Sequence, residues 1–268
     1  VVYSAQVGRA VITLNGLPAD AVPSLSLNGA FAGGSGTRTI GGNTTLDSLP
    51  VGNYTLTATP LTVGGVRFTP ASATQLVRIT TGGIAAVFVT WSIVPTVVEV
   101  TVSGLPTGAN ADATLTAPSG EAATVSATMR LSPAAAGRWR LAAQSVISGG
   151  ATYAPLRASI DTTVTAGDTL RFAVAYALNS GAVAVQIAGL PSGVGGSLTV
   201  SGPGGFSRRV TVTTTITGLA PGSYTVAAGN VAANGETYAP APTVQQVAIT
   251  ASLVATSAVV TYAQVVTT

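Results

Sequence analysis

The sequence predicts an all-β protein built as three tandem β-sandwich domains in an elongated array. One motif occurs three times, and its aromatic residues recur at steps of 85 residues. Val, Ala, Ile and Leu alternate with Thr and Ser in short runs, which is the period-2 pattern of half-buried strands. A chain of 268 residues with this period accommodates three domains, each large enough to bury its own core.

The repeated motif reads as a β-hairpin. Its copies span Leu49 to Pro70, Ser132 to Pro155 and Leu219 to Pro240. We predict that each hairpin closes in a two-residue type I′ turn at Gly64-Gly65, Gly149-Gly150 or Asn234-Gly235. One aromatic residue opens the first strand and a second lies in the return strand. The predicted core aromatics are Tyr54, Trp139 and Tyr224 in the first strands, and Phe68, Tyr153 and Tyr238 in the return strands.

The remaining strands follow from the same alternation. In the first domain we expect strands at residues 11–15, 24–28, around 37–46, 74–80 and 84–92, in addition to the hairpin. The three domains are predicted to span residues 8–93, 96–179 and 181–268, with short joins between them. A Gly-Leu-Pro triplet follows the first strand of each domain, at Gly16, Gly104 and Gly189. We interpret it as a structural feature that ends the strand.

The N-terminal residues resemble the closing strand of a domain. They compare directly with residues 259–265 near the other end of the chain. We predict an orphan β-strand over residues 1–7 that serves in assembly, made of Val1, Val2, Tyr3, Ser4, Ala5, Gln6 and Val7. Two interpretations stay open. The strand pairs with a neighbouring subunit by edge pairing or strand donation, or it belongs to a preceding domain of a longer array.

Composition excludes several classes of chemistry. The sequence has no Cys, His or Lys, so it offers no thiolate nucleophile, histidine base, Schiff-base lysine or Cys/His zinc site. The eight carboxylates fall at different places in the different repeats and suggest neither a glycosidase pair nor a calcium loop. We therefore expect a protein that is not an enzyme and that has no cofactor and no metal site.

Charge and hydropathy indicate whether the chain binds nucleic acid or spans a membrane. The net charge of +3 comes from scattered arginines without an aromatic platform, so nucleic-acid binding is not expected. The most apolar stretch, Ile84 to Val98, is too short and too rich in β-branched residues for a membrane span. Threonine runs and the Asn43 and Asn53 acceptor patterns leave glycosylation open.

The pattern L-P-x-G-x-Y-T-[LV], followed by G-G or N-G and then [FY]-x-P, carries a family resemblance. It resembles the repeat sandwiches of bacterial surface proteins, namely carboxypeptidase regulatory-like (transthyretin-like) domains and the B-type stalk domains of Gram-positive adhesins. The resemblance implies Ig-like or transthyretin-like sandwiches used as extracellular spacers. B-type domains often carry a Lys–Asn isopeptide bond, which this lysine-free chain cannot form.

These observations favour a non-enzymatic structural protein of the cell surface or the extracellular space. It would be a stalk or a filament-forming subunit whose partner is another copy of itself, joined head to tail, or an adjacent repeat of a longer chain. The alternative is an adhesin or carbohydrate-binding module that recognises a glycan through Ala109 to Glu121.

Overall fold

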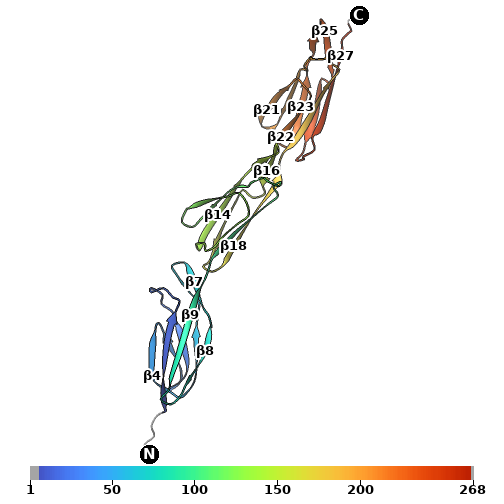
Figure 1. Ribbon diagram of the computed structural model, residues 1–268. Helices are drawn as coiled ribbons and strands as arrows, with labels where there is room; N and C mark the ends of the chain where they lie inside the picture. Colours follow the sequence, from blue (N-terminus) through green and yellow to red (C-terminus); the bar gives the residue numbers. More distant parts are fainter. Residues whose placement is uncertain (1–5, 267–268) are drawn as a thin grey trace, which may run out of the picture.

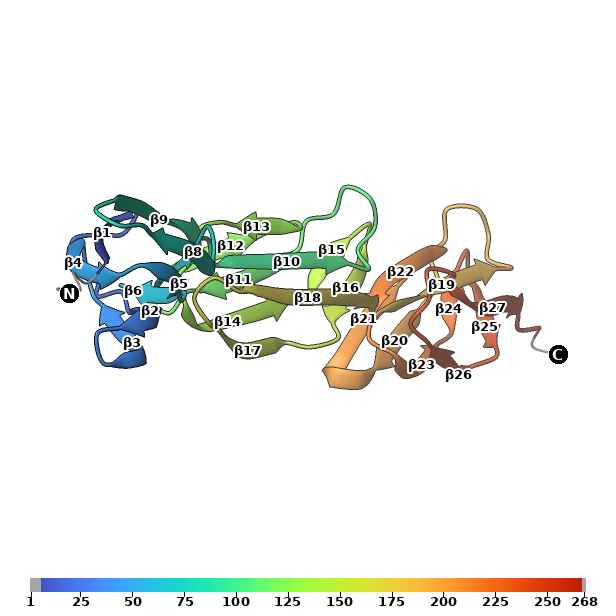
Figure 2. The same ribbon diagram turned by 90° about the horizontal axis from the view of Figure 1, so that it is seen from below.

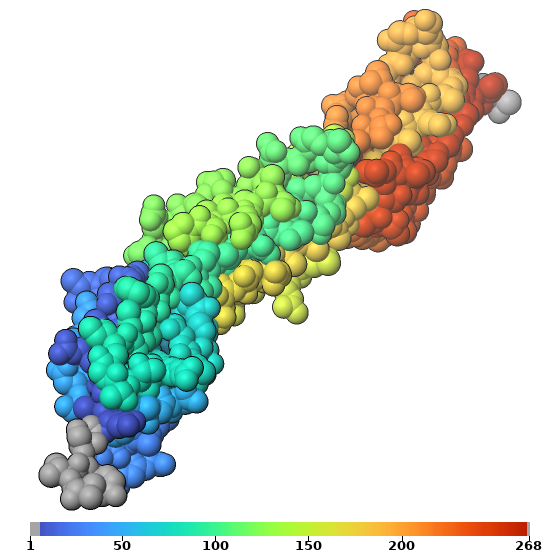
Figure 3. All heavy atoms as spheres, turned by 60° about the horizontal axis from the view of Figure 1, so that its bottom comes forward, coloured from blue at the N-terminus to red at the C-terminus, as the bar shows by residue number. Residues whose placement is uncertain are grey.

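A computed structural model describes residues 6–266 of the chain. Three β-sandwiches follow one another in a line, with the two ends of the chain at opposite ends of the molecule (Figure 1). Seen after a quarter turn, the domains keep this order (Figure 2), and in the space-filling view each touches the next (Figure 3). Apart from one 3₁₀ turn, η1 (Pro203–Gly205), the regular structure of the described residues is β-strand. The predicted all-β class with three sandwiches is confirmed.

Each domain consists of nine strands in two facing sheets. Domain 1 contains β1 (Val7–Asn15), β2 (Leu25–Phe31), β3 (Gly34–Ile40), β4 (Thr44–Pro50), β5 (Gly52–Ala58), β6 (Leu61–Val63), β7 (Val66–Pro70), β8 (Thr74–Ile79) and β9 (Ile84–Val94). Domain 2 contains β10 (Val97–Ser103), β11 (Asp112–Thr116), β12 (Ala122–Val125), β13 (Met129–Leu131), β14 (Gly137–Gln144), β15 (Val146–Ser148), β16 (Ala151–Pro155), β17 (Ser159–Val164) and β18 (Thr169–Leu178). Domain 3 contains β19 (Gly181–Ala188), β20 (Leu198–Gly202), β21 (Phe206–Val210), β22 (Thr214–Leu219), β23 (Gly222–Ala228), β24 (Val231–Ala233), β25 (Glu236–Ala241), β26 (Val244–Ile249) and β27 (Thr256–Gln264).

The three domains share one topology. In domain 1 a five-stranded sheet has the order β4-β1-β9-β7-β6, and a four-stranded sheet has the order β3-β2-β5-β8. The opening and closing strands, β1 and β9, pair in parallel from Arg9 opposite Ile84 to Asn15 opposite Thr90. The closing strand also pairs with β7 on its other side. It is therefore a central strand of its sheet, and β18 and β27 hold the same place in domains 2 and 3.

The predicted hairpin is divided between the two sheets. The type I′ turns are present, with φ of 56° and 78° at Gly64 and Gly65, and of 52° and 82° at Asn234 and Gly235. These turns join the short strand β6 to β7, whereas β5, the strand of Tyr54, pairs with β2 and β8 in the opposite sheet. The prediction that β5 and β7 form one hairpin was wrong. Both edges of β5 are already paired, so the chain crosses to the other sheet before it turns.

Two other strand boundaries differ from expectation. The segment around 37–46 is two strands, β3 and β4, which lie in opposite sheets. Gly41-Gly42 separates them and lets the chain cross over. At the N-terminal end, Val7 is the first residue of β1 and lies opposite Pro50. Val7 is therefore part of the first sandwich and does not belong to a separate strand.

Each sandwich has its own core, formed by the inward-facing residues of both sheets. The first-strand aromatics lie at the centre, and each donates a hydrogen bond to the carbonyl four residues earlier. The bonds run from Tyr54 Oη to Pro50 O (2.9 Å), from Trp139 Nε1 to Ala135 O (2.9 Å) and from Tyr224 Oη to Ala220 O (3.0 Å). The ring therefore fixes the turn that leads into its own strand.

Candidate functional site: the joints between the domains

The structure describes only part of the predicted assembly strand. Val1, Val2, Tyr3, Ser4 and Ala5 lie outside the described residues. The Gln6 carbonyl accepts a hydrogen bond from the Val51 amide (3.1 Å), and Val7, the first residue of β1, lies opposite Pro50 of β4. The assembly role of residues 1–7 stays a prediction.

The predicted aromatics lie inside the sandwiches, with one exception. Tyr54, Trp139 and Tyr224 are at most 5% exposed, and Phe68 and Tyr153 are buried as well. Tyr238 is half-buried at the C-terminal end of domain 3. Burial raises the pKa of the Tyr54 and Tyr224 phenols above the ordinary value of 10.0. A buried ring whose polar atom is hydrogen-bonded to the backbone contributes to packing and is not free to stack on a sugar.

The first joint is short, and its polar groups are satisfied. Between β9 and β10 stand Pro95 and Thr96, and Thr96 is only 4% exposed. Its Oγ1 accepts a hydrogen bond from the Gly167 amide (2.9 Å), and its carbonyl accepts one from the Ala134 amide (2.8 Å). The side chain of Arg67 reaches from domain 1 onto the loop between β17 and β18 that contains Gly167. A Cβ added to Gly167 would lie 2.6 Å from Arg67 Cδ. Domain 2 therefore holds the linker, and domain 1 packs against the same loop.

The second joint repeats this arrangement with other residues. Ser180 follows β18 and is 2% exposed. Its Oγ accepts a hydrogen bond from the Thr152 amide of domain 2 (2.7 Å), and its carbonyl accepts one from the Ser252 amide of domain 3 (3.1 Å). The hairpin tip at Gly150 meets domain 3 beside Thr217, whose Oγ1 would lie 3.0 Å from a Cβ added to Gly150. The linker is therefore hydrogen-bonded to both of the domains that it connects.

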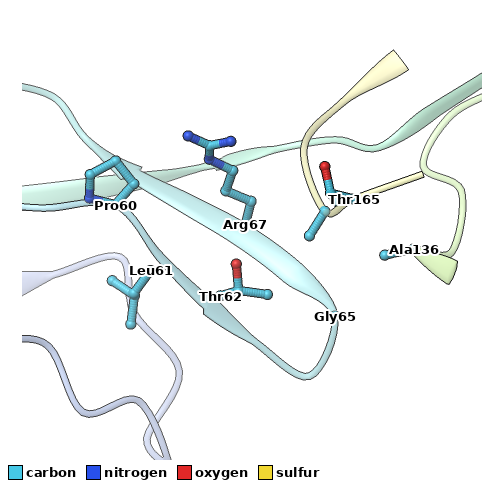
Figure 4. Close-up of a pocket in the computed structure, with 8 residues that line it drawn as sticks. Pro60, Leu61, Thr62, Gly65, Arg67, Ala136 and Thr165 are labelled. Atoms are coloured by element: carbon cyan, nitrogen blue, oxygen red, sulfur yellow. The ribbon is translucent and has the colours of Figure 1, made fainter. Parts of the chain in front are cut away.

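Cavities mark both joints. The groove at the first joint has a volume of about 460 Å³, with hairpin residues such as Thr62, Gly65 and Arg67 on one side and Ala136 and Thr165 of domain 2 on the other (Figure 4). The cavity at the second joint holds about 60 Å³. Arg67 is the one ionisable side chain among the residues that line either cavity. These surfaces contain no acid–base pair and are suited to contact between domains.

Some of the charged groups form ion pairs on the surface. Arg9 meets Asp47 at 2.6 Å, Arg138 meets Asp161 at 3.0 Å, and Glu99 lies between Arg130 and Arg171. Pairs this exposed contribute at most about 1 kcal/mol each. Within residues 6–266, no group of three His, Cys, Asp or Glu residues is placed to hold a metal ion. Nor does that part of the chain contain a helix with the length and apolarity of a membrane span.

The middle of the segment proposed for glycan recognition is a core strand. Asp112–Thr116 forms β11, and Ala111, Ala113 and Leu115 are buried. The turn from Ala117 to Glu121, closed by the hydrogen bond from the Ala117 amide to the Glu121 carbonyl (2.8 Å), is a surface loop, and the exposed Asn110 precedes the strand outside any regular element. Ala109 to Glu121 is therefore not one continuous loop, because the alternation of Ala and Leu with Thr places its middle in the sheet. Glycan recognition by this segment stays a prediction.

No family model matches the chain, and no curated protein matches it. Among solved structures it is similar to the Bacillus anthracis TIE protein, with 15% identity over 96% of this chain and 51% of that chain and a TM-score of 0.44. It is also similar to a streptococcal ancillary pilin, with 12% identity, 95% and 98% coverage and a TM-score of 0.33. A third is BcpA, the major pilin subunit of Bacillus cereus, with 10% identity, 95% and 99% coverage and a TM-score of 0.31.

The chain spans about half the length of the Bacillus anthracis protein. At these identities the similarity concerns the fold alone. The finer resemblance to carboxypeptidase regulatory-like and B-type domains stays a prediction.

Proposed function

We propose that the chain is a non-enzymatic structural protein of the bacterial cell surface or the extracellular space, acting as a stalk or a filament-forming subunit. The observation that carries the proposal is the pair of buried, hydrogen-bonded joints that hold three sandwiches in line. Such a molecule separates whatever is attached to its two ends.

The joints favour a stiff rod over a string of loosely connected domains. A flexible linker needs solvated residues that are free to rotate. Here Thr96 and Ser180 are almost fully buried, and Pro95 restricts the backbone beside Thr96. Bending the second joint would break a hydrogen bond of Ser180, whose partners belong to different domains, and a buried group that loses its partner costs roughly 1–3 kcal/mol. At the first joint Thr96 is bonded to domain 2 alone, and bending is opposed by the packing of Arg67 against Gly167. The two linkers therefore transmit orientation from one domain to the next.

Small-angle X-ray scattering tests this rod. With strands of about nine residues, each spanning roughly 30 Å, three sandwiches in line give a maximum dimension on the order of 100 Å. A matched variant carries Gly-Gly-Ser-Gly inserted after Pro95, which keeps every domain intact but frees the first joint. We expect the parent to scatter as a rod and the variant to show a broader distribution of shapes. Identical profiles for the two chains would contradict the proposal.

Strand donation by residues 1–7 is the finer version of the filament hypothesis. The closing-strand positions of the three sandwiches are filled by β9, β18 and β27, each paired on both sides. A donated strand of this pattern would therefore have to displace a resident strand or pair with an edge such as β4 or β6. Removing residues 1–5 leaves the paired Val7 in place. If strand donation builds the filament, electron microscopy of this shortened chain will show no fibres where the parent forms them.

A further inference from the structure

We propose that the groove at the N-terminal end of domain 1 binds the β24–β25 hairpin of a second copy, so that copies join head to tail by repeating the internal joint. This inference rests on the proposed role as a filament subunit and names the two contacting surfaces. The second internal joint supplies the template.

At the second joint, domain 3 presents a groove to the hairpin of domain 2. The groove comes from the start of β19, the bend in β22 and the turn after β26. Its residues are Ser180, Gly181, Ala182, Thr217, Gly218, Ser252 and Leu253. The hairpin tip, Gly149-Gly150, and the next residue, Ala151, fill this groove and leave a cavity of about 60 Å³.

The same groove exists at the N-terminal end of domain 1. It comes from the start of β1, the bend in β4 and the turn after β8, and it is lined by Val7, Gly8, Arg9, Asp47, Ser48, Gly82, Gly83 and Ile84. The equivalence follows from strand register, because Gly8 lies opposite Leu49 and Gly181 lies opposite Leu219, each followed by a bulge. Ser48 and Gly218 also share a positive φ, of 58° and 72°.

No hairpin fills the groove of domain 1 within the described part of the chain. Its volume is about 440 Å³, against about 60 Å³ where the hairpin of domain 2 fills the equivalent groove. The first seven of its lining residues correspond in order to the seven that receive the hairpin at the second joint. Domain 1 therefore carries the receiving half of a joint.

The hairpin of domain 3 carries the other half. Its tip, Asn234-Gly235, has the same type I′ geometry as Gly149-Gly150, with φ of 52° and 82° against 58° and 76°. Behind the tip, Tyr238 is half-buried, whereas its counterparts Phe68 and Tyr153 are buried. Docking in a groove would cover apolar surface at this end of the molecule.

Charge identifies a second copy of this chain as the occupant. At the second joint, Ala151 of the hairpin and Ala182 of the groove line the same cavity and are 9% and 8% exposed. In the hairpin of domain 3 the position of Ala151 is taken by Glu236, and in the groove of domain 1 the position of Ala182 is taken by Arg9. The apolar pair of the second joint is thus replaced by an acid on the hairpin of domain 3 and a base in the groove of domain 1.

Arg9 can bind Glu236 without giving up its own partner. It already contacts Asp47 through Nε at 2.6 Å, yet its side chain is 51% exposed. A guanidinium has five N–H donors, so others remain for a second carboxylate. The contact joins two different surfaces and does not close on itself, so repetition generates an open fibre.

Sedimentation velocity of the full chain, from about 10 µM to about 1 mM, tests the contact. The internal joints have a covalent linker that raises the effective concentration of their two surfaces, and two separate copies lack it. We therefore expect a dissociation constant on the order of 0.1 mM. Reversing one charge, by Glu236→Arg or Arg9→Glu, should weaken association about fivefold. The double variant should restore it to near the parent value. Glu121→Arg and Arg209→Glu are the matched controls, which change the net charge equally but lie away from both ends, and they should leave association unchanged.

Thermal unfolding of each variant checks the fold. If Arg9→Glu lowers stability by removing the pair with Asp47, the test depends on Glu236 alone. Glu236→Arg and the milder Glu236→Gln both change a side chain on the exposed hairpin. Three results would overturn the contact: a chain that stays monomeric at 1 mM, association unaffected by charge reversal at Glu236, or association that appears only after residues 1–5 are removed. The last would make the chain's own N-terminal segment the occupant. A monomeric rod would still leave the stalk function standing, whereas a non-rod scattering profile would remove that function itself.

Discussion

Replacing the glycine of the Gly-Leu-Pro triplet in domain 2 with alanine is the most discriminating test of how these sandwiches close. Gly104 has a φ of 82°, and a Cβ on it would lie 2.9 Å from the carbonyl carbon of Tyr176 and nearer still to its oxygen. The obstacle is backbone in the closing strand β18, so no rotamer change relieves it. Gly16 and Gly189 make the same approach to Trp91 and Tyr262.

Gly108 provides a control four residues away. It has a φ of 84°, and no atom lies within 4 Å of a Cβ added to it. Alanine at Gly108 therefore has only the left-handed backbone cost of about 1–2 kcal/mol. Alanine at Gly104 adds the cost of displacing a packed strand, roughly 1–3 kcal/mol by analogy with overpacked cores. We expect Gly104→Ala to destabilise domain 2 by about 2–5 kcal/mol and Gly108→Ala by about 1–2 kcal/mol.

Urea unfolding followed by tryptophan fluorescence measures this difference in one domain. The two tryptophans are Trp91 in domain 1 and Trp139 in domain 2. Tyrosine occupies the position of Trp91 in the other two domains, so a Trp91→Tyr background leaves Trp139 as the sole reporter of domain 2. Equal free energies of unfolding for Gly104→Ala and Gly108→Ala, within about 0.5 kcal/mol, would refute the role of the close approach.

Three further predictions concern the aromatics and the second joint. Desolvation raises the pKa values of the buried phenols of Tyr54, Tyr176 and Tyr224 above 10.0. The stability that these neutral phenols contribute is therefore complete below about pH 10 and is lost as pH rises through their folded-state pKa. Circular dichroism should show a melting temperature that falls as pH rises above about 10. Tyr54→Phe removes a buried donor and should cost about 1–3 kcal/mol by urea unfolding, whereas Tyr238→Phe should cost under about 0.5 kcal/mol. Ser180→Ala breaks the bond that ties the linker to domain 2, so small-angle scattering should show a more flexible second joint while the domains keep their melting temperatures.

Each of these has an outcome that contradicts it. A melting temperature unchanged up to pH 12 would show that the phenols ionise without penalty. Similar costs for Tyr54→Phe and Tyr238→Phe would show that the bond to Pro50 contributes little. If Ser180→Ala left the scattering profile unchanged, the hydrogen bond at the linker would not set the angle between domains 2 and 3.

Period, alternation and turn chemistry determined the architecture from the sequence. The three type I′ turns could be located because both central residues need positive φ, which Gly and Asn tolerate. The alternation at Tyr54 and its counterparts identified rings that face the core, because successive side chains of a strand point to opposite faces. These are local properties, and the residues themselves carry them.

Partner choice between strands was decided only by the tertiary structure. Alternation shows which face of β5 is buried, but strands in both sheets of a sandwich show the same alternation. The sequence therefore could not show that β5 and β7 belong to different sheets. The groove of domain 1 was equally hidden, because Arg9, Asp47 and Gly82 are far apart in sequence and meet only when β1, β4 and the turn after β8 reach one end of the sandwich. Local pattern fixes conformation and burial, whereas pairing and surface shape depend on which distant segments satisfy each other's backbone hydrogen bonds.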